Sequence, residues 1–174
     1  MKFLGELILK RKKSKLKRKV YFKNLDHVKS TLILYDCTDS AKSQVVKSFI
    51  RYFKENRIQV DSIGYYSKVG KNVKKPEDEI DYFFYDKKEL NPYKFTKSLK
   101  IKKLIAKQHD LMIDLNLDES FSLEVLSSLS KAKFKVGPNL KYGNDVFDLT
   151  IDIEKPKLEF LVEQIKYYIK MINK

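Results

Sequence analysis

The amino-acid sequence predicts an α/β fold with a doubly wound, Rossmann-like and mostly parallel sheet, preceded by a basic N-terminal arm. From Ser30 onward, short runs of β-branched and aromatic residues alternate with helical stripes, as in βα units. The first such run, residues 31–35, is apolar throughout, as a strand buried on both faces requires. The chain has 174 residues, 43% of them hydrophobic, which suits one core. We therefore expect an arm over residues 1–28 and a single α/β domain over residues 29–174.

The predicted strands are short and rich in apolar or aromatic residues. In chain order they cover residues 31–35, 58–66, 80–85, 111–113, 133–136 and 146–153. The strand at 80–85 is expected at an edge of the sheet. Residues 67–78, rich in Lys, Gly and Pro, are expected to form an exposed loop.

Four helices are predicted from apolar residues at helical spacing. The first follows the turn at 36–40, the second begins near residue 99, the third follows Ser120, and the fourth begins at Pro156. The last pattern is the clearest, because apolar residues from Leu158 to Ile172 lie along one face behind a proline. We expect this helix to close the fold, and we expect the basic arm to be helical as well.

Positive charge is concentrated in the arm. Residues 1–20 contain nine Lys or Arg and one Glu, so they carry +8 of the net charge of +14. Such a cluster can neutralise several phosphates and release their counterions, and an adjacent tyrosine can stack on unpaired bases. The candidate nucleic-acid-binding residues are Lys10, Arg11, Lys12, Lys13, Lys15, Lys17, Arg18, Lys19 and Tyr21.

Two other interpretations of the arm stay open. Tyr21 and Phe22 could dock it onto the domain while the lysines are merely solvated. Alternatively, the apolar stripe of Phe3, Leu4, Leu7 and Ile8 in front of the polybasic segment suits an anionic membrane surface. The same stripe would also fit the domain or a partner protein.

Acidic residues follow two predicted core strands. Asp36 and Asp114 are placed where ligands bind in open α/β sheets, outside the carboxyl ends of the strands. With Asp39 and Asp118 they could hold a divalent cation, although Asp39 and Asp118 are equally natural helix N-caps or first-turn residues. Lys141 lies between two glycine turns and could belong to an anion loop, but turn formation explains those glycines equally well.

Several function classes find no support. The turn at 36–40 has no glycine, so a nucleotide bound there in the usual way is not expected. Cys37 is the single cysteine, and we expect it to be a buried structural thiol. His27 and His109 are not spaced as metal ligands are. We assign no catalytic residue, metal or cofactor. The absence of a disulfide framework, signal peptide or long apolar stretch indicates a cytoplasmic protein without a transmembrane helix.

Part of the chain resembles a known family. Residues 130–137, which follow the segment at 110–114 and precede the helix at 164–173, are similar to an uncharacterised family of small basic proteins from Bacteroidota. The resemblance implies an intracellular α/β protein and supplies no catalytic residue.

The sequence thus favours a non-enzymatic RNA-binding or ribosome-associated protein that uses its polybasic arm. One alternative is a small-molecule-binding or enzymatic domain with its site at the carboxyl edge of the sheet. The other is peripheral attachment to the inner membrane face.

Overall fold

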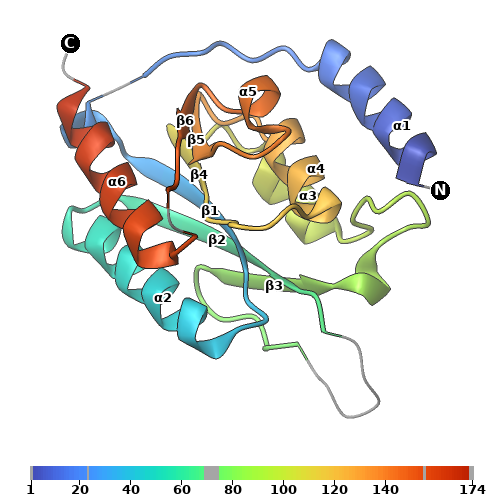
Figure 1. Ribbon diagram of the computed structural model, residues 1–174, viewed down its shortest axis with the longest axis horizontal. Coiled ribbons are helices and arrows are strands. Elements are labelled where there is room, and N and C mark those ends of the chain that lie inside the picture. Colours follow the sequence, from blue (N-terminus) through green and yellow to red (C-terminus); the bar gives the residue numbers. More distant parts are fainter. Residues whose placement is uncertain (1, 23, 69–74, 155, 173–174) are drawn as a thin grey trace.

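A six-stranded sheet forms the centre of the protein, in a computed structural model that describes residues 2–22, 24–68, 75–154 and 156–172 (Figure 1). The strands are β1 (Ser30–Asp36), β2 (Gln59–Tyr66), β3 (Tyr82–Asp86), β4 (Leu111–Asp114), β5 (Phe134–Pro138) and β6 (Leu149–Ile151). They lie in the order β3-β2-β1-β4-β5-β6, and each neighbouring pair is parallel. This confirms the predicted doubly wound, Rossmann-like fold, and β3 lies at an edge as expected.

Helices cover both faces of the sheet. They are α1 (Lys2–Lys15), α2 (Ser40–Glu55), α3 (Leu99–Ala106), α4 (Phe121–Leu129), α5 (Gly143–Val146) and α6 (Leu158–Met171), with short 3-10 helices at Leu25–His27 and Lys87–Glu89. Helices α2 and α6 share one hydrophobic core with the sheet, and α3, α4 and α5 share the other (Figure 1). The sheet is therefore sandwiched between two helical layers.

Strand β1 shows why its sequence is apolar throughout. Leu32 and Leu34 point into the core under α3 and α4, whereas Ile33 and Tyr35 point into the core under α2 and α6. All four side chains are buried. A central parallel strand buries alternate residues on opposite faces, so both sets must be apolar.

Some predicted boundaries differ from the structure. Val146 ends α5 instead of opening a strand, so β6 begins only at Leu149. Helix α5 was not predicted because four residues are too few to display a helical period. Helix α6 begins at Leu158 after Lys157 as N-cap, two residues beyond Pro156. Of the expected loop at 67–78, residues 69–74 lie outside the described part of the chain.

The N-terminal arm contains the expected helix, and this helix lies against the domain. Leu9 of α1 is only 3% exposed and packs with Phe95 and Val125, the latter in α4. Gly5 allows the close approach, since a Cβ at this position would lie 2.8 Å from the carbonyl oxygen of Tyr93 and 2.9 Å from the ring of Phe121. Helix α1 is thus part of the folded unit.

Residues 16–22, here called the strap, connect α1 with the region before β1 and cross the top of the molecule in Figure 1. The backbone N–H of Tyr21 donates to the carbonyl oxygen of Lys133 at 3.1 Å. The ring of Phe22 packs edge to face on Phe134, with 4.5 Å between ring centroids. The strap therefore lies along the segment that leads into β5.

Candidate nucleic-acid interface

A cationic groove opens beside the strap at the amino edge of the sheet. Its volume is about 360 Å³. Its lining consists of Lys17, Arg18, Lys19, Tyr21, Gln108, Lys131 and Lys133. Five of these residues are cations and none is an acid. We call it the amino-edge groove, because residues 108, 131 and 133 precede β4 and β5.

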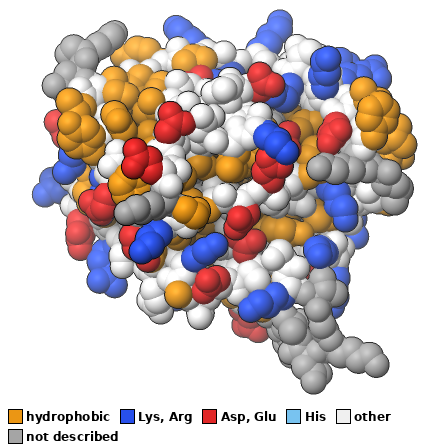
Figure 2. All heavy atoms as spheres, in the orientation of Figure 1, with side chains coloured by type: hydrophobic (Ala, Val, Ile, Leu, Met, Phe, Trp, Pro, Cys, Tyr) orange, Lys and Arg blue, Asp and Glu red, His pale blue; other side chains and the backbone are white. Residues whose placement is uncertain are grey.

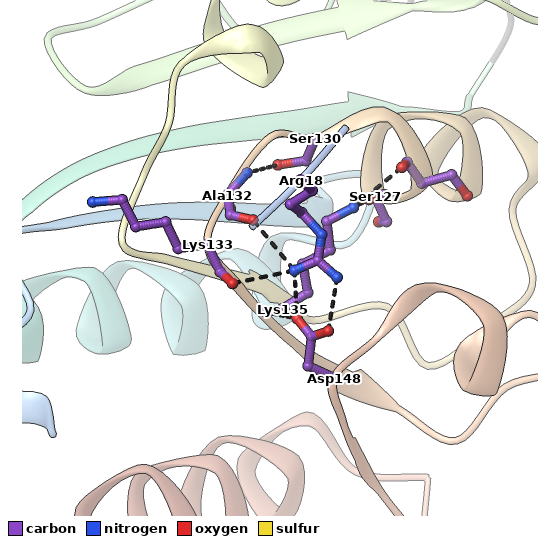
Figure 3. A network of polar contacts seen from close by, with 8 residues as sticks. Arg18, Ser127, Ser130, Ala132, Lys133, Lys135 and Asp148 are labelled. Atoms are coloured by element: carbon purple, nitrogen blue, oxygen red, sulfur yellow. Dashed lines mark hydrogen bonds and ion pairs between the residues drawn. The ribbon is translucent and has the colours of Figure 1, made fainter. Parts of the chain in front are cut away.

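Arg18 fixes the strap at this groove. Its Nη1 lies 2.6 Å from Asp148 Oδ2 and its Nη2 lies 2.7 Å from Asp148 Oδ1, a bidentate ion pair. Nη1 also donates to the carbonyl oxygens of Lys133 at 3.2 Å and Ala132 at 3.4 Å (Figure 3). The side chains of Arg18 and Asp148 are only 15% and 14% exposed. Arg18, a predicted phosphate ligand, is thus already paired with a carboxylate and positions its neighbours.

The other cations of the groove differ in their availability. Lys133 Nζ lies 2.9 Å from Asp110 Oδ1, a largely buried carboxylate. Lys17, Lys19 and Lys131 are exposed, and within the described part of the chain none of them forms an ion pair. Tyr21, 44% exposed, lines the groove with them. These three lysines are therefore the exposed cations of the groove.

Helix α1 adds further positive charge. Lys10, Arg11 and Lys15 are exposed, whereas Lys12 Nζ lies 5.8 Å from the ring centroid of Phe95. Lys13 is half-buried and lines a smaller pocket together with Arg18. The nine residues predicted to bind nucleic acid thus lie on one continuous stretch of helix and strap, but face different directions.

The apolar stripe of α1 divides between the domain and solvent. Ile8 and Leu9 pack against the α4 side of the domain. Phe3, Leu4 and Leu7 are exposed, at 69%, 49% and 50%. In Figure 2, hydrophobic and basic side chains accordingly lie close together at the upper right, over α1.

A second, larger cleft lies at the opposite edge of the sheet. It has a volume of about 480 Å³ and is formed where β1 and β4 end, the point at which the strand order reverses. Its charged lining residues are Asp36, Asp39, Lys42, Lys87, Asp118 and Glu119. The buried amide of Asn116 also lines it, and its Oδ1 has no partner among the described residues.

Three of the four predicted carboxylates, Asp36, Asp39 and Asp118, line this cleft, whereas Asp114 does not. Asp36 lines it and accepts the Thr38 N–H at 2.7 Å, and Asp39 caps α2 by accepting the Ala41 N–H. Asp114 is fully buried and accepts hydrogen bonds from Ser127 at 2.5 Å and from Asn116. Burial raises its pKa. Among the described residues there is no group of three potential metal ligands.

Lys141, the candidate anion-loop residue, lies at the surface. Its side chain is 87% exposed, and its Nζ lies 3.7 Å from Glu119 Oε1. The two flanking glycines have different local roles, since Gly137 belongs to β5 and Gly143 begins α5. Lys141 is therefore a surface cation beside Glu119.

Lys135, which lies near the strap, is not among the site residues predicted from the sequence. It is 2% exposed, and its Nζ donates to the carbonyl oxygens of Ser127 at 2.6 Å and Ser128 at 3.1 Å, at the end of α4. Burial, reinforced by the charge of Arg18, lowers the pKa of Lys135 to about 7. The sequence does contain an indication of this burial, because a lysine inside a strand of a parallel sheet covered on both faces must point into a core.

Cys37 behaves as predicted for a structural thiol. Its side chain is buried. Burial, followed by the negative charge of Asp36, raises its pKa to about 12. A thiol with so high a pKa is a poor nucleophile at neutral pH.

Together, the fold and these sites define a parallel Rossmann-like α/β protein with a docked basic helix and a cationic groove at the amino edge of its sheet. The chain matches the family of unknown function DUF6913 over residues 2–172 and belongs to that family. The match includes α1 and the strap as well as the sheet. No curated protein and no solved structure matches the sequence. Among the described residues, no helix has both the length and the apolar character needed to cross a bilayer.

Proposed function

We propose that this protein is a cytoplasmic, non-enzymatic RNA-binding or ribosome-associated protein, and that its family consists of small basic proteins from Bacteroidota. The RNA binds along α1, the strap and the amino-edge groove. The observation that supports this most strongly is the groove itself, in which Lys131 joins Lys17 and Lys19 with no acid among the lining residues. Clustering of cations from distant parts of the sequence goes beyond a general excess of lysine.

The lining of the groove suits an unpaired strand. Each phosphate contacted by a lysine releases condensed counterions, which gives affinity without sequence specificity. An exposed tyrosine among the lysines offers a surface on which a base can stack. Arg18 contributes by holding the strap against the domain, so that Lys17 and Lys19 line the same groove as Lys131.

The test compares two triple variants of equal charge. One is Lys17→Gln, Lys19→Gln and Lys131→Gln in the groove. The matched control is Lys47→Gln, Lys88→Gln and Lys157→Gln, three exposed lysines on α2, on the 3-10 helix after β3 and before α6. Fluorescence anisotropy with a labelled single-stranded RNA gives the affinity between about 50 and 200 mM salt.

Loss of three phosphate contacts reduces the slope of log K against log salt by about 2. We expect this reduction, and a weakening of at least about tenfold at low salt, for the groove variant alone. Equal weakening of both variants, or unchanged binding by the groove variant, contradicts the proposal.

A membrane surface is a second candidate partner, supported by the exposure of Phe3, Leu4 and Leu7 beside exposed Lys10 and Arg11. Apolar side chains next to cations are what an interfacial helix presents to anionic lipid. Flotation of the protein with anionic phosphatidylglycerol vesicles or with neutral phosphatidylcholine vesicles tests this candidate. The membrane candidate is rejected if phosphatidylglycerol vesicles carry no more protein on flotation than phosphatidylcholine vesicles do.

A small polar ligand in the carboxyl-edge cleft is the third candidate. The unpartnered Asn116 Oδ1 and the 480 Å³ volume support it, since small-molecule sites usually occupy about 300–1,000 Å³. Thermal-shift screening of polar metabolites on wild type and Asn116→Leu tests it. A ligand that stabilises both proteins equally does not use this cleft.

A further inference from the structure

A small pocket lies on the α4 and α5 side of the strap. It has a volume of about 240 Å³ and is lined by Lys13, Leu16, Arg18, Val20, Ser128, Lys135, Asp145 and Val146. Arg18 lines both this pocket and the amino-edge groove. Three of the lining residues are cations, and the single acid, Asp145, is exposed.

Two buried groups in this lining have unused hydrogen-bonding capacity. Ser128 is 3% exposed, and its Oγ has no partner among the described residues. Lys135 Nζ carries three protons when charged, and it donates to two carbonyl oxygens. An unsatisfied buried polar atom is destabilising, so a ligand that accepts hydrogen bonds from these groups would recover that loss.

A purely structural role explains only part of this arrangement. Lys135 caps the carboxyl end of α4, where a cation is favourable. Such a cap requires neither the unpaired hydroxyl of Ser128 nor the placement of Lys13 and Arg18 around the ammonium group. These two cations instead repel it, since Arg18 and Lys13 lower the pKa of Lys135 in addition to burial, while Asp148 opposes them.

We infer that this pocket binds a tetrahedral oxyanion of the phosphate class, with Lys135 Nζ, Ser128 Oγ and Lys13 Nζ as donors. The phosphate belongs either to an RNA backbone or to a small phosphorylated ligand. The first source rests on the proposed function, whereas binding of phosphate as such does not. No covalent step is involved.

The first experiment uses inorganic phosphate as the probe. Isothermal titration at constant ionic strength compares wild type with Lys13→Gln and Ser128→Ala, two variants that leave the Arg18 and Asp148 pair intact. Matched controls are Lys47→Gln on α2 and Ser14→Ala on α1, both at exposed positions. Circular dichroism verifies that each variant is folded.

Loss of one hydrogen bond to a charged ligand weakens binding by roughly tenfold. We expect a weakening of about this size for Lys13→Gln and for Ser128→Ala, and less than about twofold for the controls. The inference is overturned if wild type shows no heat of phosphate binding above that of chloride, or if the pocket and control variants bind phosphate alike.

The second experiment identifies the source of the phosphate. Displacement of labelled RNA by inorganic phosphate, together with weaker RNA binding by Ser128→Ala, assigns the pocket to the RNA backbone. If Ser128→Ala weakens phosphate but leaves RNA binding unchanged, the ligand is a small phosphorylated molecule. The Lys17, Lys19 and Lys131 triple variant should still bind phosphate, so failure of the RNA proposal leaves the pocket independently testable.

Discussion

Arg18 and Asp148, 130 positions apart in the sequence, form a bidentate ion pair with distances of 2.6 and 2.7 Å. Asp148 Oδ2 also accepts the backbone N–H of Lys135 at 2.8 Å. One carboxylate thus joins the strap to β5 at the point shared by the cationic groove and the Lys135 pocket (Figure 3). This contact makes the arm part of the domain surface.

Replacing Asp148 should release the strap. Asp148→Asn leaves Arg18 largely buried without its carboxylate, and we expect the free energy of unfolding in urea to fall by about 1.5–3 kcal/mol. Trypsin should also cut more rapidly after Lys17 and Lys19. The control is Glu163→Gln, whose exposed pair with Lys166 should contribute less than about 0.5 kcal/mol. Equal stability of the two variants would show that the ion pair does not hold the strap.

Enlarging Gly5 should displace α1. A side chain at this position meets the Tyr93 carbonyl and the Phe121 ring, so Gly5→Leu should cost about 1–3 kcal/mol of stability through overpacking. Proteolysis of the arm should increase in parallel. Leu7→Met, at an exposed position on the same helix, should be nearly neutral. A Gly5→Leu protein as stable and as protected as wild type would contradict the observed docking.

Asp61 should make the protein sensitive to acid. Its Oδ2 lies 2.7 Å from both His109 Nε2 and Lys107 Nζ. The hydrogen bond from His109, together with Lys107, holds the pKa of Asp61 below its ordinary value, against the effect of burial. The stabilisation is therefore present above about pH 4 and is lost as the pH falls through the lower folded-state pKa. Asp61→Asn should be less stable at neutral pH, and its difference from wild type should shrink below about pH 4 in chemical denaturation.

Lys135 should make stability increase with alkaline pH. Its folded-state pKa of about 7 lies below its ordinary value of 10.5, so between these values the unfolded chain binds more protons than the native protein. Stability should rise above pH 7 by at most about 1.4 kcal/mol per pH unit, measured without phosphate between about pH 7 and 9. Lys135→Met should lack this rise. Parallel profiles for wild type and variant would show that Lys135 does not titrate in this range.

The candidate sites were only partly predictable. Clustering of basic residues identifies α1 and the strap, but Lys131 and Gln108 join the groove through the order of the strands. Asp114 illustrates the opposite case. It follows a buried run, as a ligand-binding carboxylate would, yet its side chain is satisfied by Ser127 and Asn116 inside the domain. Side-chain direction at the end of a strand depends on neighbouring elements, which no local pattern specifies.

The parallel α/β architecture, the helical arm and the concentration of +8 in the first 20 residues are all predictable from the amino-acid sequence. These features are local, because hydrophobic periodicity and charge are read within a few turns or strands. Tertiary contacts place the arm on α4, pair Arg18 with Asp148, and bury Lys135 beside the strap. The contacts of Leu9 with Val125 and of Arg18 with Asp148 join residues more than 100 positions apart, and all three features depend on burial and geometry that exist only in the folded chain.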